Sequence, residues 1–166
     1  MVLADLTAGA VEDARDRESR TPLSVVERAA LDRPAALDAL TALAPADRVK
    51  IIAEVKRASP SRGDLADIPD PALQALRYEE GGASAISVLT EGRKFKGSLA
   101  DLEAVKAAVN LPVLRKDFIA TEYQVLEARA SGADLVLLIV AALDQDVLAR
   151  LYAFTQQLGM TALVET

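Results

Sequence analysis

Short apolar segments alternate with longer amphipathic segments over most of this chain. The apolar segments are Val49–Val55, Ala85–Leu89, Pro112–Leu114, Leu135–Val140 and Ala162–Val164. Several are rich in Val, Ile and Leu and do not alternate strictly, which is typical of parallel strands covered on both faces. The segments between them have a helical period, so the pattern predicts four βα units followed by a fifth strand.

Local signals mark the predicted helix ends. Asp70-Pro71 fits an N-cap followed by a first-turn proline, Ser98 can cap the next helix, and Thr121–Gln124 fits a capping box. The stretches "EEGGASAISVL", "RASGADLVLLI" and "QQLGMTALVE" each place a glycine between a helix end and a strand, which forms a weak internal repeat.

The first 48 residues have a different pattern, rich in Ala, Leu, Asp, Glu and Arg, and they predict two or three helices. Thr21-Pro22 and Asp32-Arg33-Pro34 are the expected breaks, with each proline suited to a first helical turn. We therefore expect an N-terminal helical extension at residues 1–48 and βα units at residues 49–166.

Two α/β architectures use repeated βα units, the open doubly wound sheet and the closed (β/α)8 barrel. No Gly-x-Gly-x-x-Gly turn follows the first strand and no Walker loop occurs, whereas charged strand ends suit a barrel. A complete barrel usually needs about 250 residues. The fold class expected for these 166 residues is thus a partial (β/α)8 TIM barrel, with strands one to five after a helical extension.

The composition of the chain argues against several classes of function. With 19 basic against 25 acidic side chains, the chain lacks the basic surplus usual in nucleic-acid binders. It has no cysteine and no histidine, so acid–base chemistry has to come from Glu, Asp, Lys or Tyr. No apolar run approaches the roughly 20 residues that cross a bilayer, and no basic leader is present. We expect a cytoplasmic protein that binds neither membrane nor nucleic acid.

Four ionisable residues stand at predicted strand ends. Glu54 and Lys56 are two residues apart on the first strand and therefore share a face, Lys116 ends the third strand, and Glu165 ends the fifth. Each also has a simpler interpretation. Glu54 and Lys56 could form a salt bridge at a strand end, Lys116 could lie in a solvated "RKD" turn, and Glu165 could be a frayed terminal carboxylate. Their coincidence favours a site, because alternate barrel strands contribute to one layer and four converging charges are costly to desolvate without a function.

Five stretches together resemble indole-3-glycerol phosphate synthase of tryptophan biosynthesis, in order from about residue 5 to residue 166: "IIAEVKRASPSRG", "SVLTEGRKFKGS", "LPVLRKDFI", "GADLVLLIVAAL" and "GMTALVE". The resemblance implies a (β/α)8 barrel with an N-terminal helical extension. It also implies ring closure, decarboxylation and dehydration of 1-(2-carboxyphenylamino)-1-deoxyribulose 5-phosphate to indole-3-glycerol phosphate, without a metal or organic cofactor.

The resemblance also implies catalytic roles. Lys116 matches the general acid that protonates the substrate ketone, and Glu165 matches the glutamate that takes part in proton transfer and steadies positive charge on the aniline nitrogen. Lys56 matches a lysine that contacts substrate anions and has been proposed as the acid in dehydration. Glu54 matches the glutamate that holds this lysine.

Four further residues match substrate-binding positions of the family. Ser59 and Pro60 match the loop that folds over the substrate, and Phe95 and Phe118 match apolar residues around the anthranilate ring. For the two phenylalanines, ordinary loop packing is the alternative.

Several alternatives stay open. The later strands of the family carry most of the phosphate site, so residues 1–166 alone are expected to be inactive. The chain could instead be a non-catalytic half-barrel that self-associates through open strand edges. A fusion to a downstream tryptophan-pathway enzyme is also open. Another ribulose-phosphate barrel enzyme, such as phosphoribosylanthranilate isomerase, fits less well because that relative uses a cysteine.

Overall fold

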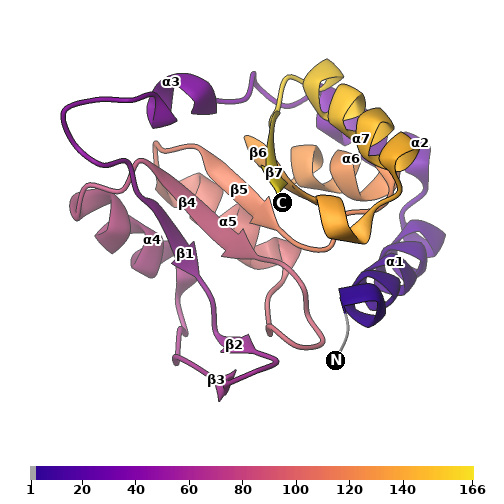
Figure 1. Ribbon diagram of the computed structural model, residues 1–166, viewed down its shortest axis with the longest axis horizontal. Helices are drawn as coiled ribbons and strands as arrows, with labels where there is room; N and C mark the ends of the chain where they lie inside the picture. The colour runs from indigo at the N-terminus through magenta and orange to yellow at the C-terminus, as the bar shows by residue number, and fades with distance from the viewer. Residues whose placement is uncertain (1–2) are drawn as a thin grey trace.

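The computed structural model describes residues 3–166, in which helices alternate with the strands of a curved sheet (Figure 1). The N-terminal part contains helices α1 (Leu3–Arg20), α2 (Leu23–Leu31) and α3 (Ala39–Leu43). The rest contains β1 (Ile52–Val55), β2 (Ala58–Ser59), β3 (Gly63–Asp64), α4 (Pro71–Glu80), β4 (Ala85–Leu89), α5 (Leu99–Ala108), β5 (Val113–Lys116), α6 (Glu122–Ala130), β6 (Leu135–Ile139), the 3-10 helix η1 (Val140–Ala142), α7 (Gln145–Gln157) and β7 (Thr161–Glu165).

The main sheet has five strands in the order β1-β4-β5-β6-β7, and every neighbouring pair is parallel. In the main sheet, one α-helix, from α4 to α7, lies between each strand and the next. This confirms the predicted succession of four βα units and a fifth strand. The short strands β2 and β3 form a separate antiparallel pair after β1, which the sequence pattern did not predict.

The predicted helix ends are confirmed. The side chains of Asp70, Ser98 and Thr121 each accept a backbone N–H of the first turn, and Thr121 forms a full capping box with Gln124. After α4, α6 and α7, the backbone takes the left-handed conformation that glycine adopts most easily, at Gly82, Gly132 and Gly159.

Two predicted boundaries were wrong. The first strand begins at Ile52 and not at Val49, which is exposed. No helix begins at Pro34. The chain from there to Asp38 has no regular secondary structure, and it is held by a bond from Arg129 to the Pro34 carbonyl and by the Leu37 N–H, which donates to Asp134 at 2.8 Å. The third helix starts only after Asp38, whose side chain caps it.

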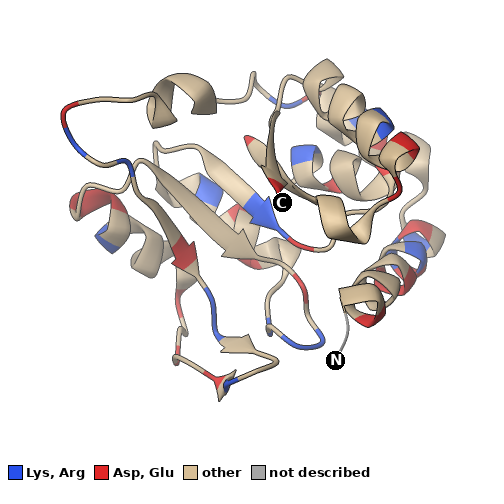
Figure 2. Cartoon of the chain, in the orientation of Figure 1, with Lys and Arg blue, Asp and Glu red and all other residues tan. Residues whose placement is uncertain are grey.

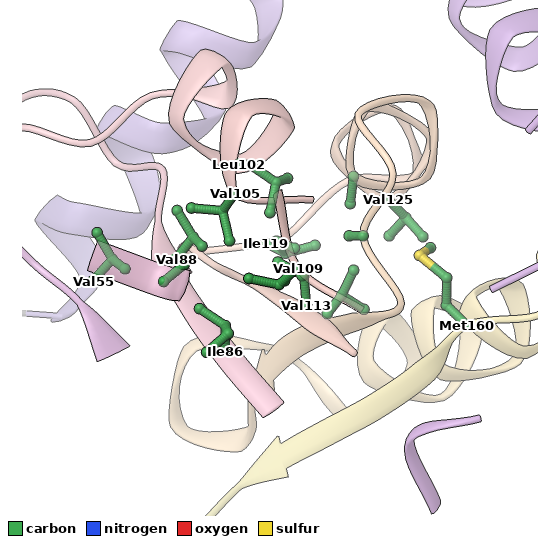
Figure 3. Close-up of a cluster of buried hydrophobic side chains, with 14 of the residues drawn as sticks. Val55, Ile86, Val88, Leu102, Val105, Val109, Val113, Ile119, Val125 and Met160 are labelled. Carbon is green, nitrogen blue, oxygen red and sulfur yellow. The ribbon is translucent and has the colours of Figure 1, made fainter. Parts of the chain in front are cut away.

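The main core lies between the outer face of the sheet and helices α4, α5, α6 and α7 (Figure 3). Outward-facing strand residues such as Ile86, Val88 and Val113 are fully buried there. They pack against helix residues such as Val105 and Val125. The helices thus cover the outer face of the sheet, and its concave face is left to form the wall of a cavity.

The N-terminal helices pack at two places, α3 on the strands and the first two helices on α6. On the concave face, Ala39 of α3 packs with Leu114, Leu135 and Leu137 near the amino ends of the strands. In Figure 1, α3 lies at the end of the sheet opposite the β2–β3 pair. Elsewhere, α1 and α2 share an apolar cluster with Tyr123 and other residues of α6. The division at residue 48 stays a prediction.

Candidate active site

A cavity of about 200 Å³ lies at the carboxyl ends of the parallel strands. Figure 2 shows acidic and basic segments meeting at this end of β1, β5 and β7. The cavity is lined by Glu54, Lys56, Leu89, Phe95, Lys116, Asp117, Phe118, Leu137, Ile139 and Glu165. The structure thus brings six of the eight sequence-predicted site residues to one wall.

Glu54 is the centre of the charged group. One carboxylate oxygen lies 3.1 Å from the Lys56 ammonium and the other lies 3.3 Å from the Lys116 ammonium. The hydroxyl of Ser87, on the adjacent strand β4, donates to the second oxygen at 3.0 Å. A single carboxylate therefore holds two lysines from different strands at fixed positions.

The surroundings of Glu54 keep it ionised. Partial burial would raise the pKa of the carboxyl group, but the hydrogen bond from Lys56 and the positive charges of Lys116 and Lys56 outweigh it. The bond from Ser87 acts in the same direction. The pKa of Glu54 is accordingly lowered from its ordinary value, so that its charge balances part of the lysine charge.

Strand alternation decides which side chain of the "RKD" stretch faces the cavity. Leu114 packs in the concave cluster and Lys116 lines the cavity above it. Arg115 points the other way and is only 1% exposed. The solvated-turn interpretation is therefore wrong for Arg115, and Asp117 is buried too.

Two aromatic rings complete one side of the cavity. The ring centroids of Phe95 and Phe118 are 6.0 Å apart, with the planes tilted by 46°. The carboxylate of Glu91 folds the loop before Phe95, because it accepts the backbone N–H groups of Arg93, Lys94 and Phe95 at 2.7–3.0 Å. A flat apolar group could lie against these rings beside the charged wall.

The remaining predicted residues lie differently. Glu165 lines the cavity from the end of β7 but is exposed, and among the described residues no ion pair or hydrogen bond joins it to the lysines. Ser59 and Pro60 lie in the β2–β3 segment and do not line the cavity. Sequence reasoning missed the lining residues Leu89, Asp117, Leu137 and Ile139, although their places at strand ends could have indicated them.

Other features of the described residues do not compete with this cavity. A hollow of about 560 Å³ lies outside the sheet, but two of its charged lining residues, Arg17 and Glu127, are paired with each other. Within residues 3–166, no three acidic side chains gather where they could hold a metal ion. In the same range, every helix is too short or too polar to cross a membrane.

The family model of indole-3-glycerol phosphate synthase matches residues 3–166, nearly the whole chain. The chain belongs to the indole-3-glycerol phosphate synthase family. This is a family of TIM barrels and carboxy-lyases, in agreement with the parallel sheet described above. The match favours this family over the isomerase alternative.

Curated indole-3-glycerol phosphate synthases match the chain over 164 residues. The protein of Leifsonia xyli subsp. xyli is 71% identical, and 99% of this chain matches 63% of that relative. The proteins of Beutenbergia cavernae and of a Nocardioides species are 62% and 58% identical over 61% and 63% of their lengths. The chain thus spans about three fifths of the length of these relatives.

Proposed function

We propose that the cavity is part of the active site of an indole-3-glycerol phosphate synthase. The substrate would be 1-(2-carboxyphenylamino)-1-deoxyribulose 5-phosphate, a small phosphorylated molecule, and the products indole-3-glycerol phosphate, carbon dioxide and water. The observation that carries the proposal is Glu54, which holds Lys56 and Lys116 at the same cavity wall as two aromatic rings.

Lys116 is the proposed general acid of ring closure. In this step a bond forms between the carboxylate-bearing ring carbon and the substrate ketone carbon, and the ketone oxygen gains a proton from the Lys116 ammonium. The Glu54 carboxylate, 3.3 Å away, keeps this ammonium in place. A positioned acid is needed because negative charge builds on the oxygen in the transition state.

Lys56 and the two glutamates have the other proposed roles. Loss of carbon dioxide and then of water completes the indole ring, and Lys56 binds substrate anions and protonates the departing hydroxyl. Glu54 orients Lys56 through the 3.1 Å contact. Glu165, at the rim, takes part in proton transfer and stabilises positive charge on the aniline nitrogen, for which its exposed carboxylate is accessible.

The substrate-binding roles are proposed in the same way. Phe95 and Phe118 would pack around the anthranilate ring, for which their tilted pair offers an apolar surface. Ser59 and Pro60 would fold over the bound substrate, although they lie outside the cavity here.

The direct test is the fluorescence of the indole product formed by the full-length protein. Replacing Lys116 by Met should lower kcat by at least about 100-fold, the usual contribution of a positioned acid. Arg150→Met removes a cation from an exposed pair on α7 and should leave kcat unchanged. Normal turnover by Lys116→Met would overturn the proposed role, and no turnover by the unsubstituted protein would overturn the function.

Three finer expectations also stay predictions: a cytoplasmic location, self-association through the open edges of β1 and β7, and fusion to a second tryptophan-pathway enzyme. Sedimentation and intact mass of the natural protein would test the last two.

A further inference from the structure

A buried group of charged residues lies next to the cavity on the outer side of the sheet, and one of its members, Asp117, also lines the cavity. Arg115 is 1% exposed, Glu127 5% and Asp117 6%. Arg17 of helix α1 contacts Glu127 from outside at 2.5 Å. We call these residues, with Thr90 at 8% exposure, the β5 anchor. None of its members was among the residues expected to carry chemistry.

Arg115 uses its whole guanidinium group in the β5 anchor. Its Nε donates to the Thr90 hydroxyl and one Nη to Asp117, both at 3.0 Å. The other Nη donates to the Gln124 carbonyl at 2.7 Å and to Glu127 at 3.4 Å. One side chain thereby joins the end of β4, the end of β5 and the first turns of α6.

Asp117 continues these contacts on the other side of Lys116. Its carboxylate accepts the Thr90 hydroxyl at 2.6 Å and the backbone N–H of Phe118 at 2.8 Å. Lys116 therefore lies between two residues whose side chains are held from behind. Rotation of the backbone at Lys116 would break several buried hydrogen bonds at once.

The charges of the β5 anchor balance. Arg115 and Arg17 supply two positive charges, and Asp117 and Glu127 supply two negative charges. The anchor therefore adds no net charge next to the cavity. We expect it to affect Lys116 by fixing its position and not by an electrostatic field. Buried ion networks are weak contributors to stability, since an apolar side chain would avoid their desolvation cost. A positional role is the simpler explanation for a buried arginine with these contacts.

We infer that Arg115 is a positioning residue for the reaction. It fixes the end of β5 so that the Lys116 ammonium stays at Glu54 and the Phe118 ring stays at Phe95. The kinetic side of this inference rests on the proposed function, whereas the placement of Lys116 can be measured without turnover.

The kinetic experiment compares three variants of the full-length protein. Arg115→Met should lower kcat about 10- to 100-fold with KM within about threefold, because a displacement near 1 Å of a reacting group has effects of this size. Arg115→Lys keeps the charge but not the forked geometry and should recover part of the loss. Leu151→Ala removes a buried side chain of α7 that is not part of the anchor. Measured at a temperature below its melting temperature, this variant should keep kcat within about twofold of the unsubstituted protein.

The second experiment measures the acetylation rate of each lysine by peptide mass spectrometry. In Arg115→Met, the rate at Lys116 relative to exposed Lys50 should rise at least about threefold, because the ammonium leaves its carboxylate partner. The ratio of Lys94 to Lys50 should not change. If Arg115→Met does not fold, Thr90→Val removes one hydroxyl of the anchor and takes its place in both experiments.

The outcomes separate the two proposals. Unchanged kcat and unchanged Lys116 acetylation in a folded Arg115 or Thr90 variant would overturn the inference. An equal loss of kcat in Leu151→Ala would also overturn it, because the effect would then be general destabilisation. If the unsubstituted protein has no activity, the proposed function fails. The acetylation rates alone then show whether the anchor positions Lys116.

Discussion

Replacing Glu54 by Gln is the most informative single change at the site. Gln keeps the size of the side chain and an oxygen that can still accept the Ser87 hydroxyl. It removes the negative charge that lies 3.1 Å from Lys56 and 3.3 Å from Lys116. The two ammonium groups then face each other without their shared carboxylate.

The structure sets the size of the expected effect. The two lysine side chains are 35% exposed and that of Glu54 is 25% exposed, so water screens both pairs in part. Pairs of this kind contribute about 0.2–1 kcal/mol each. With the added repulsion of the lysines, the free energy of unfolding at pH 7 should fall by about 1–2 kcal/mol.

The effect should depend on pH in one direction. Because the pKa of Glu54 is lowered by folding, its stabilising contribution is present above the unfolded pKa and is lost as the pH falls through the folded pKa. The difference in unfolding free energy between wild type and Glu54→Gln should therefore be largest near neutral pH. It should shrink as the pH falls from about 5 through the acidic range in which glutamates titrate.

Urea unfolding followed by circular dichroism at several pH values measures this difference. Glu122→Gln is the matched control, because it breaks the exposed pair with Arg150 and should cost less than about 0.5 kcal/mol. Equal stability of Glu54→Gln and wild type at pH 7 would refute the argument. A loss that persists undiminished at acidic pH would also refute it, since its cause would not be the charge.

Three further predictions follow from the packing and the fold. Gly97→Ala should cost at least about 2 kcal/mol in urea unfolding and displace the loop of Phe95, because an added Cβ would lie 2.1 Å from the Leu89 carbonyl oxygen. In Gly159→Ala the added Cβ would meet no atom within 4 Å, and only the left-handed backbone at φ +76° opposes it, so the free energy of unfolding should fall by only about 1 kcal/mol. A larger loss for Gly159→Ala than for Gly97→Ala would contradict both estimates. Residues 1–166 expressed alone should form indole product at below about 1% of the rate of a whole relative such as the Leifsonia xyli protein, of which the chain covers 63%, because the resemblance implies that later strands carry most of the phosphate site. Comparable rates would contradict this expectation.

Part of the candidate site was predictable because strand ends and strand periodicity are local. The spacing of Glu54 and Lys56 placed both on one face, and the parallel order of the strands brought Lys116 to the same end. The roles of these residues could not come from spacing and were inferred from the resemblance. Ser59 and Pro60 lie in the β2–β3 segment and outside the cavity lining, and the short pairing of this segment was not predicted.

The helix caps, the glycine turns and the succession of parallel strands were predictable from the sequence, because each depends on residues within a few positions of one another. The burial of Arg115 and Asp117 was not predictable in this way, since their partners Thr90 and Glu127 lie elsewhere in the chain and meet them only in the folded protein. The irregular segment at Pro34 has the same cause, because its hydrogen bonds come from residues about 95 positions away. Long-range polar contacts of this kind leave no periodic pattern in the chain, and here they hold the end of the strand that carries Lys116.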